Sequence, residues 1–194
     1  MAESLDPIAE FQALFTRISQ DAPTDPTAVA LATADASGAP SARMVLLKGV
    51  DSRGFMFFTN YDSRKGHDLS ENPRAALCWY WAWLELQVRA EGEIERLSAA
   101  ESDAYFATRP RGSQLGAWAS FQSQPLDSRF ALLRRVLATE ARYFGRDIPR
   151  PPHWGGYLLR PHAIEFWQGK KSRLHERRRF ELDGGTWRCD RLSP

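Results

Sequence analysis

The chain of 194 residues is 43% hydrophobic and 26% charged, a balance typical of a soluble globular protein that buries a core. Its formal net charge of +2 is too small to favour a nucleic acid or an anionic membrane surface as a partner. The two cysteines exclude a disulfide framework, and no apolar run is long enough to cross a bilayer. We therefore expect a single reduced, cytoplasmic domain over residues 1–194, without a signal peptide.

The first half of the sequence predicts one helix followed by strands. Over residues 5–20 the apolar residues recur at helical intervals, and Asp6 followed by Pro7 is a typical helix start. Residues 1–25 are therefore expected to form an N-terminal helix and loop. Strands are predicted over residues 28–35, 41–51, 54–60, 74–83 and 84–97. The last two strands show little alternation of apolar and polar residues, so we expect both of their faces to be covered.

The second half predicts two helices and then a return to strands. Ser98 and Glu101 form a capping box at the start of a helix over 98–110, which Pro110 ends. A second amphipathic helix is expected over 125–145. The strands that follow are expected over residues 155–161, 163–169 and 178–192, with a hairpin at the Asp-Gly-Gly turn. Because strands and helices do not alternate strictly, we expect a mostly β protein, an antiparallel barrel with peripheral α-helices, rather than a doubly wound parallel sheet.

Several common catalytic motifs are absent from the sequence. It contains no Gly-rich dinucleotide motif, no P-loop and no G-x-S-x-G. The four histidines, at 67, 153, 162 and 175, lack the spacing of metal ligands, so we predict no metal site.

The stretch Ser63, Arg64 and Lys65 follows the apolar run that ends in Thr59 and Asn60. A hydroxyl and two cations at the transition from strand to helix are typical of a phosphate cradle, because the free backbone N–H groups of a helix start also favour anions. Taken alone, the same residues favour a solvated helix start with a serine cap over a phosphate cradle.

Two further groups of cations suggest anion binding. Arg43 and Lys48 are five residues apart on one predicted strand, so they would point to opposite faces and hold two different anions, or be edge charges in water. Tyr105 and Arg109 would share a helix face, with Ser113 just beyond the helix end. Together these three suit a phosphate monoester, or form a helix-surface pair beside an unrelated loop serine.

Polar and aromatic residues in the last third suggest a ring-shaped ligand. Gln122 and Ser123 could contact the polar edge of a heterocycle, or be ordinary loop residues. Trp167 offers a planar face. Arg173 and His175 are two residues apart, so in a strand they would share one face and orient an anionic or phenolic ring oxygen. The alternative is a basic, solvated strand that contacts nucleic acid, which the near-neutral charge of the chain makes secondary.

The order of these motifs resembles the pyridoxamine 5′-phosphate oxidase family. From about residue 28 to the C-terminus the chain carries RMVLLK, FFTN with SRKG, LELQV, YFATRPRGSQLGAWAS, QS, WGGY, EFWQG, RLHER and WRCDRLSP in succession. RPRGSQLGAW and RLHER are specific to this family rather than to flavin-binding split barrels in general. The resemblance implies a homodimeric, Greek-key-like FMN-binding split β-barrel with the flavin at the subunit interface, in which strands over 154–194 carry part of the active site.

The resemblance also implies the residues of the site. FMN would contact Arg43, Met44, Val45, Leu46, Leu47, Lys48, Phe58, Thr59, Ser63, Arg64, Lys65, Gln87, Gln122, Ser123, Trp167 and Arg177, of which Ser63, Arg64 and Lys65 would hold its phosphate. The substrate phosphate would lie among Lys48, Tyr105, Arg109 and Ser113. Arg173 and His175 would lie against the substrate ring as the catalytic pair, with Arg173 holding the substrate over the flavin.

The activity implied is the oxidation of pyridoxamine and pyridoxine 5′-phosphates to pyridoxal 5′-phosphate, with oxygen as acceptor and hydrogen peroxide as second product. Two alternatives remain. One is a flavin oxidase of the phenazine-pathway type, against which the set Tyr105, Arg109 and Ser113 argues. The other is a non-catalytic binder of flavin, haem or pyridoxal phosphate, which the substrate-phosphate set, Arg173 and His175 make less favoured.

Three departures from the family pattern stand out. A longer basic N-terminal arm, which covers the substrate in some members, is expected to be missing. Leu86 replaces the arginine that many members carry before the glutamine of LELQV. The run RRRF after the His-Glu pair is more basic than usual.

Overall fold

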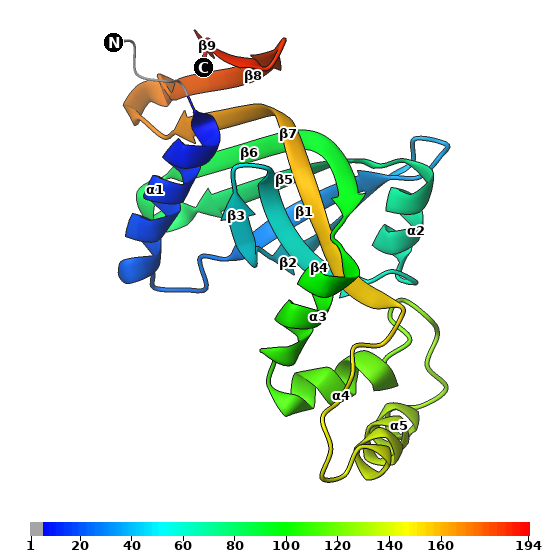
Figure 1. Ribbon diagram of the computed structural model, residues 1–194. Coiled ribbons are helices and arrows are strands. Elements are labelled where there is room, and N and C mark those ends of the chain that lie inside the picture. The colour runs from blue at the N-terminus through cyan, green and yellow to red at the C-terminus, as the bar shows by residue number, and fades with distance from the viewer. Residues whose placement is uncertain (1–5) are drawn as a thin grey trace.

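A computed structural model describes residues 6–194, and its centre is a strongly curled antiparallel sheet (Figure 1). Within these residues the strands are β1 Ala28–Ala34, β2 Pro40–Leu46, β3 Gly49–Asp51, β4 Gly54–Asn60, β5 Arg74–Trp81, β6 Leu86–Arg96, β7 Trp154–Gln168, β8 Glu176–Asp183 and β9 Thr186–Arg191. The helices are α1 Pro7–Gln20, α2 Arg64–Glu71, α3 Ala99–Ala107, α4 Arg111–Ala119 and α5 Arg129–Arg142, with short 3₁₀ turns η1 Ala82–Leu84 and η2 Lys171–Arg173.

The long strand β7 organises the sheet. The strand order is β2-β1-β5-β6-β7-β4-β3, and β8 and β9 extend the sheet from β7. Strand β6 pairs along most of β7, while β4 and β8 share its other edge: β4 pairs with Trp154 to Leu159 and β8 with Ala163 to Gln168. A register shift at Glu91 and Gly92 of β6 bends this central pair. Residues of β4 and of β8 are thereby fixed to one continuous strand.

The hydrophobic core fills the concave side of the sheet, where α1 covers it (Figure 1). The Asp6 side chain caps α1 by accepting from the backbone N–H groups of Ile8 and Ala9. From this helix Phe11 is fully buried, with ring centroids 4.9 Å from Phe55 and 4.8 Å from Trp79. Aromatic pairs at such distances add to the energy of burial, so they fix the helix on the sheet.

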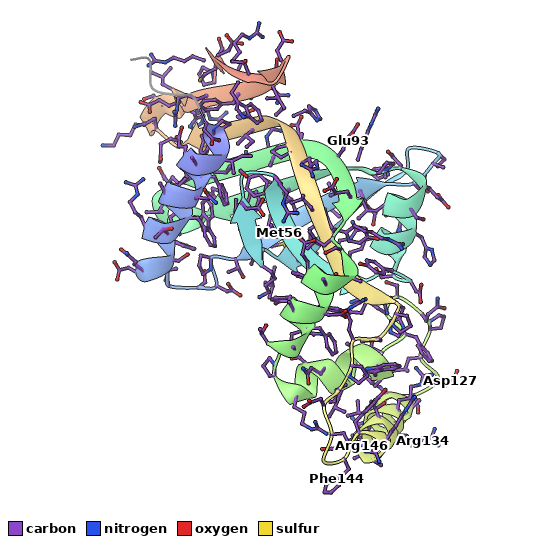
Figure 2. All side chains as sticks on the ribbon, viewed as in Figure 1. Met56, Glu93, Asp127, Arg134, Phe144 and Arg146 are labelled. Carbon is purple, nitrogen blue, oxygen red and sulfur yellow. The ribbon has the colours of Figure 1, made fainter. Side chains whose placement is uncertain are left out.

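Helices α3, α4 and α5 gather at the end of the molecule opposite β8 and β9 (Figure 1). Figure 2 shows Arg134, Phe144 and Arg146 at the extremity of this end, and Phe144 is 81% exposed. No helix in the described part of the chain is long and apolar enough to span a membrane.

Most of the predicted elements are present, but the strand predicted over 41–51 is wrong. It is divided at Leu47 and Lys48, because Leu46 still pairs with Ala28 of β1 whereas Gly49 already pairs with Met56 of β4. Strands β2 and β3 stand at the two ends of the strand order. The two residues between them therefore connect the two edges of the curled sheet, and Arg43 and Lys48 do not share a strand.

Four further local predictions are corrected. The strands expected over 155–161 and 163–169 are one strand, β7, and burial alternates along β6 instead of being continuous. Helix α4 follows Pro110 directly, so Ser113 lies inside a helix, because a proline that ends one helix can also precede the first turn of the next. Arg173 and His175 do not lie in a strand: Arg173 belongs to η2, and β8 begins only at Glu176.

Candidate functional site

A cavity of about 930 Å³ lies between β2, β4, the start of α2 and the α3–α4 region. Most residues predicted to bind FMN or the substrate phosphate line it: Arg43, Met44, Val45, Leu46, Lys48, Phe58, Thr59, Arg64, Lys65, Tyr105, Arg109, Ser113, Gln122 and Ser123. Among the described residues, no aspartate or glutamate lines this cavity. The cavity therefore favours an anionic ligand.

The Ser63–Lys65 stretch forms the positive end of this cavity. The Ser63 hydroxyl caps α2 by accepting from the Gly66 N–H, and it also accepts a hydrogen bond from Lys65 Nζ at 3.1 Å. The ammonium of Lys65 donates further to Thr59 Oγ1 at 3.0 Å and to Gln122 Oε1 at 2.9 Å. The two interpretations of the sequence are thus compatible, because the cap and the cation belong to one arrangement.

Lys65 is a buried cation whose hydrogen-bond partners are neutral. It is 8% exposed, and burial, helped by repulsion from Arg43, lowers its pKa to about 8. An ammonium in this position gains most from an anion that approaches it from the cavity. The donor set at the start of α2, with free backbone N–H groups, therefore fits a phosphate group such as that of FMN.

A second region of positive charge in the cavity is that of Arg109. Its guanidinium lies 4.5 Å from the ring centroid of Trp154, and its buried Nη1 has no hydrogen-bond partner within residues 6–194. Burial lowers the pKa of Arg109 and raises the pKa of Tyr105, whose ring stacks on Phe58 with centroids 3.9 Å apart. Arg109 and Ser113 line the same cavity, and, among the described residues, Arg109 has an N–H group free to donate there. This combination fits a phosphate monoester.

Four other predicted residues lie together elsewhere in the fold. Gln87 pairs with Trp167 across β6 and β7, and Trp167 pairs with Arg177 across β7 and β8, so the three form one cross-strand row. The His175 ring lies 4.6 Å from that of Trp167. Trp167, His175 and Arg177 line a second cavity of about 700 Å³, together with residues of α1. The described residues that line this second cavity are all different from those that line the first.

Arg177 is held in place by a buried carboxylate that the sequence did not point to. Glu165 is 3% exposed and accepts hydrogen bonds from Arg177 Nε at 2.9 Å and from Arg89 Nη2 at 2.6 Å. Burial alone would raise the pKa of Glu165, but these two hydrogen bonds keep it below its usual value.

The remaining predicted residues take other places. The Leu47 side chain is buried in the hydrophobic core and Ser63 is fully buried as a cap, so neither lines the cavity. Arg173 is exposed on η2 and lines neither cavity. Leu86 lines the second cavity. Of the basic run after His175, Arg178 pairs with Glu10 and Arg179 with Glu91 and Glu181, so these charges are not merely solvated.

Comparison with known proteins identifies the family. A family model described as pyridoxamine 5′-phosphate oxidase matches residues 16–143, and one described as the pyridoxine 5′-phosphate oxidase C-terminal dimerisation region matches residues 154–194. The chain belongs to the pyridoxamine 5′-phosphate oxidase family. Among relatives named pyridoxine/pyridoxamine 5′-phosphate oxidase, that of Rubrobacter xylanophilus is 56% identical, covering 97% of this chain and 87% of the relative, and that of Bordetella petrii is 57% identical, covering 97% and 89%.

Solved structures show the same fold. PhzG from Burkholderia lata, in complex with tetrahydrophenazine-1-carboxylic acid, matches with a TM-score of 0.94 at 34% identity, covering 100% of this chain and 95% of that one. An FMN-binding protein from Nostoc punctiforme related to pyridoxamine 5′-phosphate oxidases matches with a TM-score of 0.78 at 18% identity, covering 98% and 100%. The predicted split-barrel fold is confirmed, and membership of the oxidase family supports FMN as the cofactor.

Proposed function

We propose that the protein is an FMN-dependent oxidase that converts pyridoxamine and pyridoxine 5′-phosphates to pyridoxal 5′-phosphate with oxygen as acceptor. The observation that carries this proposal is one cavity lined by two separate cationic groups, around Lys65 and around Arg109, and by no carboxylate of residues 6–194. A cofactor phosphate and a substrate phosphate require two such groups. The names of the relatives at 56% to 57% identity support the same substrates.

The residues of the chain would act mainly by position and charge. Arg64, Lys65 and the start of α2 would hold the flavin phosphate, while Lys48, Tyr105, Arg109 and Ser113 would hold that of the substrate. When bound, FMN would supply the acceptor for a hydride from the C4′ carbon of the substrate and would pass the electrons to oxygen, which gives hydrogen peroxide. Fixing both phosphates would align the reacting carbon, and alignment accounts for much of the barrier that such an enzyme lowers.

The proposal includes a homodimer in which each site is shared. Gln87, Trp167, His175 and Arg177 lie together, and three of them line a different cavity from that of Lys65 and Arg109. The match of residues 154–194 to a dimerisation region supports the interpretation that these residues complete the cavity of the partner subunit. Arg173, exposed beside them, would then hold the substrate over the flavin, and His175 would orient its ring substituents.

A second candidate is an oxidase of the phenazine-pathway type, favoured by the TM-score of 0.94 to PhzG. The residues that would hold a substrate phosphate argue against it, because the ligand named for PhzG carries a carboxylate and no phosphate. Among the described residues, Arg109 keeps an unsatisfied N–H group at a wall shared with Ser113, which suits a phosphate.

An anaerobic titration of the FMN-loaded protein tests the function. Pyridoxamine 5′-phosphate should bleach the absorbance of the oxidised flavin, as expected for a bound flavin that accepts a hydride. Air should then restore the absorbance and leave pyridoxal 5′-phosphate. A flavin that stays oxidised with both pyridoxamine and pyridoxine phosphates, but bleaches with tetrahydrophenazine-1-carboxylic acid, would replace the proposal with the second candidate.

A further inference from the structure

Behind the first cavity, Arg43 is anchored by a buried network that involves Thr33 and Asp68. Thr33 Oγ1 donates to Asp68 Oδ2 at 2.5 Å and accepts from Arg43 Nη1 at 2.6 Å. Arg43 Nη2 donates to Ser41 Oγ at 2.7 Å and approaches Asp68 Oδ2 at 3.5 Å. Both partners are hidden, since Thr33 is 4% and Asp68 is 5% exposed.

The network connects three elements. Thr33 lies in β1, Arg43 in the neighbouring β2, and Asp68 in α2, whose first turn carries Arg64 and Lys65. Asp68 does not line the cavity, but Arg43 does. The carboxylate therefore lies behind the arginine and faces the protein interior, where it orients the Thr33 hydroxyl so that the oxygen of this hydroxyl accepts from Arg43.

We propose that Asp68 and Thr33 are positioning residues that fix Arg43 as a permanent positive charge for the flavin phosphate. The inference rests on the proposed function, in which this end of the cavity holds that phosphate. Three of the hydrogen bonds from the Arg43 terminal nitrogens, those to Thr33, Ser41 and Asp68, hold the guanidinium to the protein. Its contribution to binding is therefore a charge of fixed location, and that location depends on Thr33 and Asp68.

Two simpler roles predict different outcomes. If Asp68 were only a negative charge near the phosphate, its neutralisation would remove a repulsion and tighten FMN binding. If Thr33 and Asp68 served only the stability of the fold, their replacement would weaken FMN and riboflavin binding alike. Riboflavin is FMN without its phosphate, so the ratio of the two dissociation constants isolates the phosphate contribution.

The test measures the affinity of the full-length, flavin-stripped protein for FMN and for riboflavin by fluorescence titration. The variants are Thr33→Val, which keeps the shape but removes the hydroxyl, Thr33→Ser, which keeps the hydroxyl, and Asp68→Asn. Glu71→Gln is the matched control, because Glu71 is an exposed carboxylate on the same helix. Thermal unfolding of each variant verifies that it is folded.

We expect Thr33→Val and Asp68→Asn to raise the dissociation constant of FMN about tenfold, the change that corresponds to one charge-assisted hydrogen bond. The dissociation constant of riboflavin should stay within about twofold of the wild-type value, because riboflavin carries no phosphate for Arg43 to bind. Thr33→Ser and Glu71→Gln should keep the wild-type ratio of the two constants.

Equal losses of affinity for both flavins, or tighter FMN binding in Asp68→Asn, would overturn the inference while leaving the proposed function in place. If Asp68→Asn does not fold, the comparison of Thr33→Val with Thr33→Ser decides. A wild-type protein without preference for FMN over riboflavin would overturn the proposed function and this inference with it.

Discussion

At the scale of single residues, the charge at the positive end of the cavity depends on how far burial lowers the pKa of Lys65. Lys65 is hidden by the same fold that places its ammonium among Thr59, Ser63 and Gln122. With its pKa lowered to about 8, Lys65 is protonated at neutral pH but loses its proton under mildly alkaline conditions. The flavin affinity should therefore depend on pH.

We expect FMN to bind more weakly as the pH rises above about 8, the pKa of Lys65 in the free protein. Above this pH most of the free protein has a neutral Lys65, and tight binding of the phosphate requires that Lys65 takes up a proton. The dissociation constant of FMN should therefore rise by up to about tenfold per pH unit. Titrations of FMN and riboflavin between about pH 7 and pH 10, a range that brackets this pKa, measure the effect. Riboflavin affinity should change little, and Lys65→Met should remove the pH dependence for FMN. An FMN affinity that is flat across this range in the wild type would contradict the prediction.

The lowered pKa of Lys65 has the opposite effect on the stability of the flavin-free protein: stability rises with pH where FMN affinity falls. In the unfolded chain Lys65 has its ordinary pKa of 10.5, whereas in the folded protein it releases its proton from about 8. Between these two values unfolding takes up a proton, so this residue makes the folded state relatively more stable as the pH rises. The pH dependence of FMN affinity and that of stability can thus be separated.

At the scale of elements, the bend of the β6–β7 pair decides where the sheet curls. The register shifts at Glu91 and Gly92, opposite Pro161. A Cβ atom on Gly92 would collide with the carbonyl group of Arg160, so the close approach of these two backbones needs a glycine. Gly112, in contrast, lies in α4 with no described neighbour near the position of its missing Cβ atom.

We therefore expect opposite effects from the same substitution at these two glycines. Gly92→Ala should lower the free energy of unfolding by roughly 1–3 kcal/mol, because the backbone must move to accept the methyl group. Gly112→Ala should raise it by roughly 0.5–1 kcal/mol, since alanine loses less entropy in a helix. Urea unfolding of both variants measures the difference, and a Gly92→Ala protein as stable as Gly112→Ala would show that the bend tolerates a side chain.

At the scale of the whole molecule, the two groups of site residues are separated within one chain. Arg109 lines the first cavity and His175 the second, and the region around His175 matches a dimerisation region. In a symmetric dimer each subunit could then give its second group to the cavity of the other. Damage to the first group would then affect the site of the same subunit, and damage to the second group would affect the site of its partner.

Mixed dimers test this arrangement. Arg109→Ala and Arg173→Ala homodimers should each be nearly inactive, because each has both of its sites damaged. A heterodimer of the two, isolated with two different affinity tags, would have one site with both changes and one intact site, so it should recover about half of the wild-type activity. If each site belonged to a single subunit, both sites of the heterodimer would carry one change and no activity would return. Equal FMN content in all three samples is the control.

The sequence by itself determined the types of element and the family, because helix caps, apolar periodicity and the ordered motifs are local properties of the chain. Ser98 with Glu101 predicted the capping box that α3 has, and the order of RMVLLK, SRKG and RLHER indicated the oxidase family. Three of the cations that the sequence singled out, Arg43, Lys65 and Arg109, line one cavity, while their roles in binding stay a prediction.

The tertiary structure alone decided which of these residues meet, because contacts between distant segments follow from strand pairing and not from spacing. The break at Leu47 and Lys48 depends on a change of partner strand from β1 to β4, which no local pattern encodes. Asp68, Glu165 and Trp154 were not among the predicted site residues, yet the fold places each against one of the predicted cations, Arg43, Arg177 and Arg109 respectively. Spacing likewise suggested a strand for Arg173 and His175, whereas the chain turns at η2 before β8 resumes pairing with β7.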